Sequence, residues 1–428
     1  MNVNIFNSFN AYRAHLESHA SHNISNTVQE IIAAVRERGD AALKEYTEKF
    51  DGAHIDNFRI PESQMQQALH LLDPKLKQIL LEAADNIRKF HQRQKSETQL
   101  EFSEDGTVLG WKVTPIDAVG VYVPGGRAVL FSTLLMNVIP AQVAEVPRIA
   151  VLSPPEKNGL PSPLMMAAAA LMGVQEMYAI GGAQAIAALA YGTESVPRVF
   201  KITGPGNAYV AEAKRQVYGV VGIESIAGPS DILILCDQRD ASIEYLTRDM
   251  LSQAEHDPEA RALLITTSTE QATSVAERLQ NLVPTLPKRE IIEASFDGSS
   301  AIITVDDLDS GFEAVNEIAP EHLEILTAQP FNDLHKVRNA GAIFLGPNTP
   351  EPVGDYYAGP NHTIPTSGCA KFSSPLGVQD FVKSSSILKY SASRLRKEGP
   401  SIIGFAEAEG LHAHAAAIQA RLDQFSLE

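Results

Sequence analysis

Two polar side chains share one face of a predicted helix and could together hold a metal ion. They are Gln253 and His256 in the segment LSQAEHDP, and their i, i+3 spacing puts both on one helical face. Asp355 and His362 in a later loop and His414 near the C-terminus are further candidate ligands. Nitrogen and oxygen ligands without a thiolate suit a catalytic zinc better than a structural one. Because the candidates are dispersed, spacing alone leaves open whether they meet, and for any single histidine a surface or core position is the alternative.

An adjacent carboxylate and imidazole, Glu321 and His322, form a second group of chemically useful side chains. They follow a predicted helix and lead into the predicted strand LEILT. This position is near a strand end, where active sites of α/β proteins tend to form. The two side chains are bases of different strength, and the imidazole can work near neutral pH. Taken alone, the pair is also compatible with a solvated loop.

Three glycine-rich turns stand where a predicted strand passes into a predicted helix. Their sequences are PGG at 124–126, GGAQ at 181–184 and GPGN at 204–207. Such turns bring backbone N–H groups and a helix N-terminus toward a ligand, which favours phosphate. None matches the G-x-G-x-x-G fingerprint, so each alone is compatible with an ordinary tight turn. Three of them in one α/β series favour a nucleotide-like ligand.

Short β-type runs alternate with helix-type runs from Val119 onward, which predicts parallel βαβ units. The first series contains VGVYV, RIAVL, EMYAI and VFKIT, and the second contains DILIL, RALLIT, SAIITV, LEILT and GAIFLG. Two successive series predict two similar sheet domains. Helices are expected over 27–50, 62–95 and 400–425. The stretch 346–370, dense in Gly, Pro, Asn and Thr, is expected to be a long loop, which inside a compact domain is usually functional.

Composition narrows the class of protein and its partners. With 428 residues, of which 44% are hydrophobic, the chain has material for about two or three globular domains. A net charge of −17 argues against sequence-independent binding of nucleic acid or of anionic lipid. Small molecules are therefore the expected partners. Two distant cysteines, Cys236 and Cys369, indicate a reducing cytoplasm. The N-terminus lacks a signal layout, and the longest apolar stretch, 164–174, is too short to span a bilayer.

Together these segments resemble the histidinol dehydrogenase family over nearly the whole chain. The segments that carry the resemblance are VGVYVPGGRA (119–128), GGAQAIAALAYGT (181–193), KITGPGNAYVAEAK (201–214), AGPSDILIL (227–235), LSQAEHD (251–257), APEHLE (319–324), GDYYAGPNHTIPT (354–366), SSPLGVQDF (373–381) and EGLHAHAAAIQAR (409–421). Several are long and specific. The resemblance implies an enzyme of the last step of histidine synthesis, which oxidises L-histidinol through L-histidinal to L-histidine with two NAD⁺.

The resemblance also implies a role for particular residues. The zinc ligands would be Gln253, His256, Asp355 and His414, and the catalytic pair Glu321 and His322. Substrate contacts would come from the ligands and His322 together with Ser230, His362 and Glu409. Contacts to NAD would come from Tyr122, Gln184 and Asn207. Two departures from the family pattern are Pro360, where a small polar residue is common in the G-x-N-H segment, and His412, which offers a competitor for His414.

The fold implied by the resemblance is a homodimer with two incomplete Rossmann-like domains and intertwined helical extensions. The expected boundaries are 1–22 for the N-terminal extension, 23–115 with 236–375 for the first Rossmann-like domain, 116–235 for the second, NAD-binding domain, and 376–428 for the C-terminal extension. The C-terminal helix of each subunit would reach the site of its partner.

Two alternative functions are compatible with the same scaffold. A paralogue acting on another small alcohol, such as a sulfonated propanediol, would use the same scaffold, but His362 and Glu409 suit a nitrogen-bearing substrate. A non-catalytic, NAD-sensing or scaffold protein should have lost part of the catalytic pair or of the zinc set, and all of these residues are present.

Overall fold

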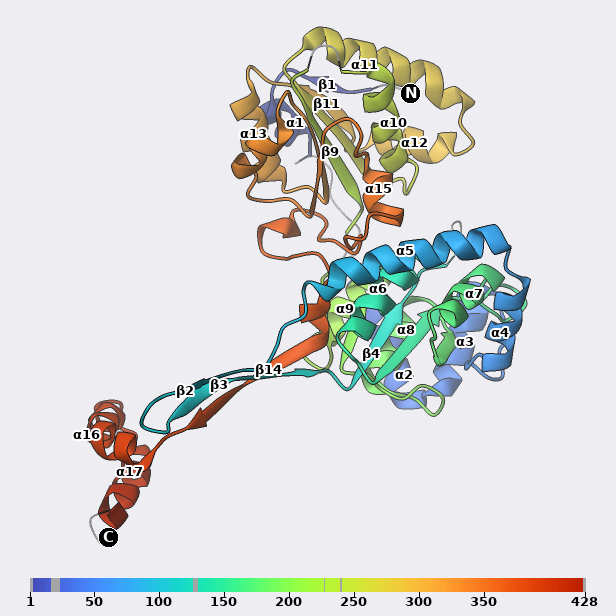
Figure 1. Cartoon of the computed structure of the whole chain (residues 1–428). Coiled ribbons are helices and arrows are strands. Elements are labelled where there is room, and N and C mark those ends of the chain that lie inside the picture. The colour runs from blue at the N-terminus through green and yellow to red at the C-terminus, as the bar shows by residue number, and fades with distance from the viewer. Residues whose placement is uncertain (1–2, 17–23, 126–129, 227, 239–240, 426–428) are drawn as a thin grey trace. The chain divides into compact units, whose positions relative to one another are not determined.

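The computed structural model describes residues 3–16, 24–125, 130–226, 228–238 and 241–425, and the turn residue Gly126 lies outside them. The chain divides into two compact units, residues 1–94 with 116–381 and residues 95–115 with 382–428. The first unit contains two parallel sheets and the second a small antiparallel sheet with two helices (Figure 1).

A six-stranded parallel sheet carries the second predicted series. Its strand order is β1 (Ile5–Phe6), β11 (Ala301–Thr304), β10 (Arg261–Thr266), β9 (Asp231–Cys236), β12 (His322–Leu326) and β13 (Ala342–Leu345). The helices are α1 (Phe9–Leu16), α10 (Ile243–Ala254), α11 (Thr269–Leu282), α12 (Arg289–Asp297), α13 (Leu308–Ile318), α14 (Pro330–Asp333) and α15 (Glu351–Tyr356).

The central strand of this sheet is buried on both faces. Ile232 and Ile234 of β9 pack with side chains of α10, α11 and α12, whereas Leu233 and Leu235 pack with α1 and α13. Figure 1 shows these two helical layers on opposite sides of the strands. Since each strand buries alternate side chains in both layers, continuous apolar runs such as DILIL are what the sheet requires.

A five-stranded parallel sheet carries the first predicted series. Its strand order is β6 (Glu176–Ala179), β5 (Arg148–Ser153), β4 (Ala118–Tyr122), β7 (Lys201–Thr203) and β8 (Gly222–Ile223). The crossover helices are α6 (Phe131–Val143), α7 (Pro163–Leu171), α8 (Gly182–Tyr191) and α9 (Ala208–Val217). Strand order reverses between β4 and β7, because β5 and β6 extend the sheet on one side of β4 and β7 and β8 on the other.

The helices near the N-terminus pack on the helices of the five-stranded sheet. They are α2 (Ser25–Arg38), α3 (Asp40–Asp51), α4 (Glu62–Leu71) and α5 (Pro74–Gln92). α2 contacts α8 and α9, α4 contacts α7, and α5 contacts α6. The sequence analysis had instead grouped residues 23–115 with residues 236–375 in one domain. The predicted division into four parts as a whole stays a prediction.

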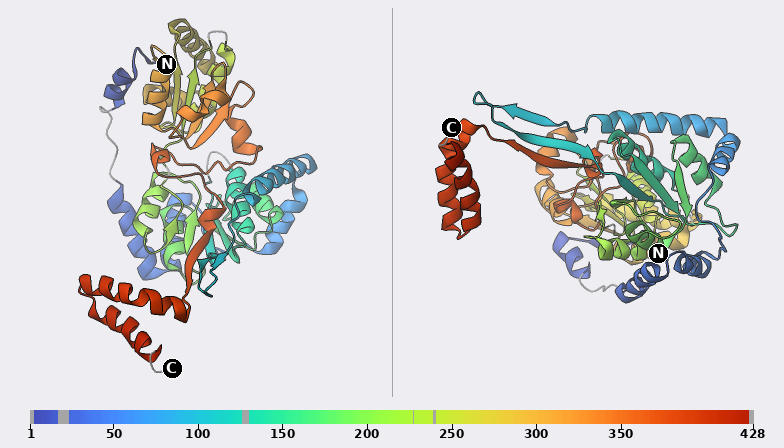
Figure 2. Two further views of the ribbon diagram at one scale, coloured as in Figure 1. Left: turned by 60° about the vertical axis from the view of Figure 1, so that its left-hand side comes forward. Right: turned by 90° about the horizontal axis from the view of Figure 1, so that it is seen from below.

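The second unit is an antiparallel sheet with a pair of helices. β3 (Val108–Pro115) pairs with both β2 (Gln99–Phe102) and β14 (Val382–Lys389). α16 (Ala392–Ala408) and α17 (His412–Phe425) lie side by side (Figure 2). Large apolar side chains of this unit remain exposed in the single chain, among them Phe102 at 73%, Leu388 at 70% and Phe405 at 71%. A small unit with so much exposed apolar surface is typical of a protein interface.

The nine predicted β-type runs are confirmed, and three predicted helices are each two shorter ones. Gly39, at φ 54°, separates α2 from α3, Pro74 starts α5 behind the capping Asp73, and Gly410 separates α16 from α17. Gly tolerates the left-handed backbone, and Pro has no N–H to continue a helix. The helical spacing of apolar residues therefore predicted one continuous helix where the chain has two. The sequence analysis missed β1, β8 and the antiparallel sheet.

Short elements complete the first unit. The stretch 346–370, predicted to be a loop, contains the helix α15, and short 3₁₀ turns lie at Val283–Thr285, Leu334–Lys336, Cys369–Lys371 and Val378–Phe381. Within the described ranges, no helix combines the length and apolar character needed to cross a membrane.

Candidate functional site

The Glu321–His322 pair is held by the residue that begins the neighbouring strand. Asp231, at the start of β9, donates its N–H to Glu321 Oε2 over 2.9 Å, and its Oδ1 accepts the N–H of Glu321 over 2.8 Å. The carbonyl oxygen of Asp231 accepts a hydrogen bond from His322 Nδ1 over 3.0 Å. Ser230 adds a short hydrogen bond from its hydroxyl to Glu321 Oε2. Backbone and side chain of one residue thus fix both members of the pair.

The edge of the sheet at which this pair lies differs from the one that the sequence suggested. Ligands in doubly wound α/β sheets bind outside the carboxyl ends of the strands, but Glu321 precedes β12, and Ser230 precedes β9. The group is therefore at the amino edge of the six-stranded sheet. The argument from the usual strand end was wrong here, because α10 runs back antiparallel to the strands and carries Gln253 and His256 to this same edge.

His322 has one ring nitrogen engaged and one directed into the site. A carbonyl oxygen only accepts, so Nδ1 must donate to Asp231, and Nε2 remains 3.5 Å from Asp355 Oδ1. Burial lowers the pKa of His322, but the charges of Glu321 and Asp355 outweigh burial and raise it to about 10. In the metal-free chain these surroundings therefore favour the protonated imidazole. A cation bound by Asp355 would cancel part of that charge and lower the pKa again.

Glu321 has the environment of a base that is available near neutral pH. Burial raises the pKa of its carboxyl to about 7, against the opposing effects of the His322 charge and the Ser230 hydrogen bond. The charge of Asp231 raises the pKa of Glu321 further. A carboxylate with a pKa near 7 is a much better proton acceptor than one with an ordinary value.

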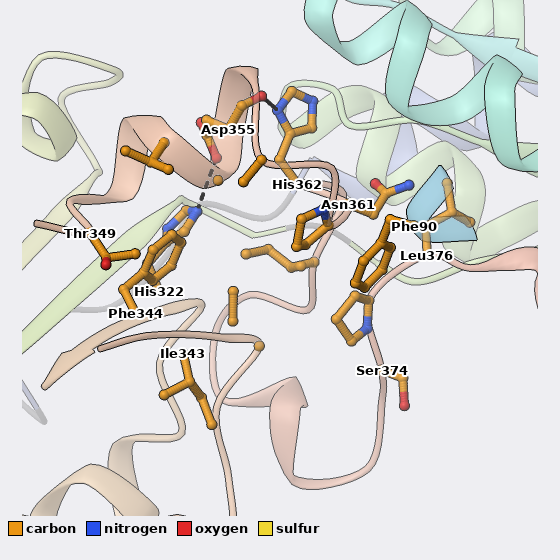
Figure 3. A pocket seen from close by; sticks show the side chains of 18 of the residues that line it. Phe90, His322, Ile343, Phe344, Thr349, Asp355, Asn361, His362, Ser374 and Leu376 are labelled. Carbon is orange, nitrogen blue, oxygen red and sulfur yellow. Dashed lines mark hydrogen bonds and ion pairs between the residues drawn. The ribbon is translucent and has the colours of Figure 1, made fainter. Parts of the chain in front are cut away.

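A pocket with a volume of about 300 Å³ opens beside His322 (Figure 3). Asp355 and His322 lie next to each other in its lining with their side chains directed toward one another, and His362 Nδ1 donates to the backbone oxygen of Asp355 over 3.0 Å. Burial lowers the pKa of His362, so its ring is neutral and its Nε2 can accept a hydrogen bond. Phe344 and Ile343 supply apolar walls, which lie next to the polar group.

Gln253 is the observation that most favours a bound metal. Its side chain is fully buried, and neither Oε1 nor Nε2 has a hydrogen-bond partner among the described residues. An amide buried without partners costs free energy unless a ligand completes it. Burial lowers the pKa of His256, three residues on, and the charges of Asp355 and His322 also act on it, although the residue as a whole is exposed in the single chain. Gln253, His256 and Asp355 therefore fit a cation held by nitrogen and oxygen.

A second set of possible ligands overlaps the first. One ligand atom each from His322, Glu351 and Asp355 lies within 4.8 Å of the others. Glu351 begins α15, which also carries Asp355, and its N–H donates to Glu324 Oε1 over 2.8 Å. Glu324, Glu351 and Asp231 are buried carboxylates that the sequence analysis did not single out; the position of Asp231 directly after Ser230 was the available signal.

The predicted ligand His414 and the predicted substrate contact Glu409 belong to the second unit. Glu409 caps the C-terminus of α16, directly after Ala408, and His414 lies in the first turn of α17. Both are exposed in the single chain, as is the competitor His412.

The three predicted NAD contacts lie around the point where strand order reverses in the five-stranded sheet. Tyr122 ends β4, Gln184 lies in the first turn of α8, and Asn207 caps α9 after β7. Gln184 is buried with its Oε1 unpartnered in the described chain, whereas the Asn207 oxygen already accepts from two backbone N–H groups of α9. Reversal points at the carboxyl ends of strands are where dinucleotides bind.

A buried ion pair shapes the glycine turn beside Asn207. Glu224 Oε1 accepts from Lys214 Nζ over 2.7 Å and from the N–H of Gly204 over 2.8 Å, and Lys214 also donates to the Gly204 carbonyl. At Gly204, φ is 112° and an added Cβ would collide with the carbonyl of Tyr122. Only glycine lets the ends of β4 and β7 approach this closely.

Comparison with known proteins gives one consistent family. A family model described as histidinol dehydrogenase matches residues 15–422. The chain is 52% identical over 397 residues to a histidinol dehydrogenase of Geobacillus kaustophilus, covering 93% of each protein. It is 53% identical over 399 residues to one of Halalkalibacterium halodurans, covering 93% of this chain and 94% of the relative. The crystal structure of histidinol dehydrogenase from Elizabethkingia anophelis aligns with a TM-score of 0.93 at 34% identity, covering 100% of this chain and 99% of that one.

The buried carboxyl groups give the metal-free protein a defined pH dependence. Burial raises the pKa of Glu324 to about 8 and that of Glu351 to about 9, from an ordinary 4.5. Groups whose pKa is raised by folding contribute stability below the unfolded value and lose it as pH rises through the folded value. We expect the free energy of unfolding of chelated protein to fall by at least about 1 kcal/mol between about pH 6 and about pH 9 in urea titrations.

Glu324→Gln should reduce that slope, because the amide keeps the acceptor for the N–H of Glu351 and does not ionise. The matched control is Glu277→Gln on the exposed face of α11, which should leave the slope unchanged. Equal slopes in wild type and Glu324→Gln would refute the assignment of the pH dependence to the buried carboxyl groups.

Proposed function

Since the chain belongs to the histidinol dehydrogenase family, we propose that it oxidises L-histidinol through L-histidinal to L-histidine, the last step of histidine biosynthesis. The family uses NAD and a zinc ion. The observation that carries the proposal is the buried Glu321–His322 pair, held by Asp231 beside the unpartnered amide of Gln253.

In the first oxidation His322 acts as the general base. Its Nδ1 is occupied by the Asp231 carbonyl, so Nε2 takes the proton of the substrate hydroxyl as the carbon loses a hydride. The fixed hydrogen bond at Nδ1 keeps the ring in the tautomer that this step needs. The aldehyde formed stays in the pocket beside His322.

In the second oxidation Glu321 acts on water. Its carboxylate accepts a proton from the water that adds to the aldehyde, while His322 returns to the aldehyde oxygen the proton it took in the first oxidation. The hydrate then loses an O–H proton to His322 and a hydride to the second NAD⁺, and the acid formed ionises to the carboxylate product. The raised pKa of Glu321 makes this proton transfer favourable near neutral pH. Enclosing the aldehyde between the two steps prevents its escape.

Gln253, His256 and Asp355 would hold the zinc ion together with His414. When bound, zinc supplies a Lewis-acidic template for the nitrogen donors of the substrate, and each NAD⁺ accepts one hydride. We favour this ligand set over His322, Glu351 and Asp355, because His322 Nε2 has to stay free as the base. The orphaned amide of Gln253 supports the same choice.

Substrate recognition would fall to three further residues. Ser230 lies against Glu321, His362 lines the pocket, and Glu409 would pair with a cationic or N–H group of the substrate. Glu409 would repel the anionic group of a sulfonated diol. Relatives that are 52% and 53% identical to this chain are histidinol dehydrogenases, so a diol substrate is not favoured.

For the cofactor we propose the carboxyl edge of the five-stranded sheet, with Tyr122, Gln184 and Asn207 as contacts. The reversal of strand order between β4 and β7 and the unpartnered Oε1 of Gln184 support this position.

We further propose a homodimer in which each site takes His414 and Glu409 from the partner. The exposure of both side chains and the exposed apolar surface of the second unit support it. The chain has two cysteines, Cys236 and Cys369, which are not joined in a disulfide; this is compatible with a cytoplasmic location, which is part of the proposal.

The central test counts reduced cofactors. Purified protein with zinc, NAD⁺ and a limiting amount of L-histidinol should form about two NADH for each histidinol consumed, as two hydrides require. NADH is followed by absorbance, and histidine is identified chromatographically. One NADH with accumulation of aldehyde, or no turnover, would contradict the proposed reaction.

Glu321→Gln should separate the two half-reactions. Because an amide does not accept a proton from water, histidinal oxidation should fall by about a hundredfold or more, whereas histidinol oxidation should fall by less than about tenfold. The two reactions are measured separately by stopped flow. Glu313→Gln, on the exposed face of α13, is the matched control. Equal losses in both half-reactions would remove the special role of Glu321 in hydration.

Complementation tests the shared site. A His414→Ala chain and a His322→Ala chain should each be inactive, but their heterodimer contains one intact site. Random mixing should therefore restore roughly a quarter of wild-type activity, since half of the dimers are heterodimers. Native mass spectrometry confirms that heterodimers form. No activity in a confirmed heterodimer would rule out sites shared between subunits.

A further inference from the structure

Asp51 is a carboxylate in an unfavourable local position. It is the last residue of α3, directly before Gly52, which caps the helix at φ 66°. The carboxyl end of a helix carries partial negative charge and disfavours an acidic side chain. Burial also raises the pKa of Asp51 to about 6, which means that its environment disfavours the charge. Two separate effects thus make this residue costly for the folded chain.

Among the residues that the structure describes, none donates a hydrogen bond to Asp51 Oδ2, which is buried. The other oxygen faces Gly181, where an added Cβ would lie 3.3 Å from Oδ1. A buried acceptor without a donor is rare in native proteins and calls for a ligand or a functional explanation.

The carboxylate lines a cavity of about 260 Å³ at the carboxyl edge of the five-stranded sheet. Pro124 and Gly125 follow β4 there, and Ser153 and Pro154 end β5 and begin the next turn. The charge of Asp51 raises the pKa of Tyr122, after burial, so Asp51 lies close to a proposed cofactor contact. The other charged groups of the cavity, Glu156 and Lys157, are exposed on its rim.

The place of the cavity in the sheet indicates which part of a dinucleotide would reach it. In Rossmann-type sheets the second strand of the βαβ series ends in an acidic residue. This residue binds the 2′-hydroxyl of the adenosine ribose. β5 is the corresponding strand here, and it ends in Ser153 followed by two prolines; the first acid after it, Glu156, is exposed. Asp51, from a helix outside the βαβ series, brings a carboxylate to the same end of the sheet.

We propose that Asp51 binds the adenosine ribose of the dinucleotide and makes this enzyme select NAD over NADP. The inference rests on the proposed function, because it requires the cofactor to bind at this edge. The vicinal hydroxyls of a ribose supply two O–H donors for the carboxylate. The 2′-phosphate of NADP lacks one of these donors and brings negative charge against Asp51, so the same contact recognises one cofactor and repels the other.

The test compares Asp51→Asn with wild type for both cofactors. With zinc and histidinol present, the variant should have a KM for NAD raised by about ten- to hundred-fold, the range for a lost hydrogen bond to a charged group. Its ratio of kcat/KM for NAD over NADP should fall by at least about tenfold. Calorimetry with NAD alone, in which no turnover occurs, should show an equal loss of affinity for NAD. Glu48→Gln, exposed on the last turn of α3, is the control and should match wild type.

Thermal unfolding of the cofactor-free protein supplies a second readout. Removing an unpaired buried charge should leave the Tm unchanged or raise it, whereas loss of a structural contact would lower it. A lower Tm, or an unchanged NAD to NADP ratio in an active Asp51→Asn variant, would overturn the inference. A change in that ratio found with Glu156→Gln in place of Asp51→Asn would assign the role to the rim and overturn it as well. If wild type itself fails to reduce NAD with histidinol, the proposed function fails instead.

Discussion

The set of hydrogen bonds around Asp231 is the constraint on which the candidate site depends. One residue at the start of β9 contacts Glu321 through its N–H and Oδ1, and His322 through its carbonyl. Its remaining carboxylate oxygen pairs with Arg261, the first residue of β10, over 2.8 Å. Arg261 in turn donates its N–H to the Ser230 carbonyl. The register of three adjacent parallel strands thus determines where the base and the carboxylate lie.

The same constraint explains why the site is at the amino edge of its sheet. Parallel strands start at one edge, so the residues that precede β9 and β12 are neighbours, and α10 ends beside them. At the five-stranded sheet the carboxyl edge is organised by a different buried charge pair, Lys214 and Glu224, which fixes the turn after β7. In both places a buried charge is bonded to backbone groups of a turn, which compensates the cost of burying it.

Among the buried polar groups of the described chain that lack a partner, several belong to residues for which ligands are proposed. The amide of Gln253 and the oxygens of Gln184 and Asp51 have no partner, and Glu324 and Glu351 are held in surroundings that disfavour their charge. Apolar packing on both faces of the sheets supplies stability that such groups reduce. A protein that binds a cation and a dinucleotide needs donors and acceptors that are left open before the ligand arrives.

The sequence by itself determined the alternation of strands and helices and the membership in a family, because continuous apolar runs and long specific segments are local properties of the chain. It also marked Gln253, His256, Glu321 and His322 as candidates by their chemistry. Helix ends at Gly39, Pro74 and Gly410 escaped it because they depend on single residues. The pairing of β3 with β14 escaped it because the two strands are far apart in the chain.

Only the tertiary structure decided which edge of the sheet carries the catalytic pair and that Asp231 holds it. Only the tertiary structure left the amide of Gln253 and Oδ2 of Asp51 without a partner among the described residues. The physical reason is the same in each case: a hydrogen bond, a buried charge or a missing partner is a relation between distant residues, and composition or periodicity along the chain does not encode that relation directly.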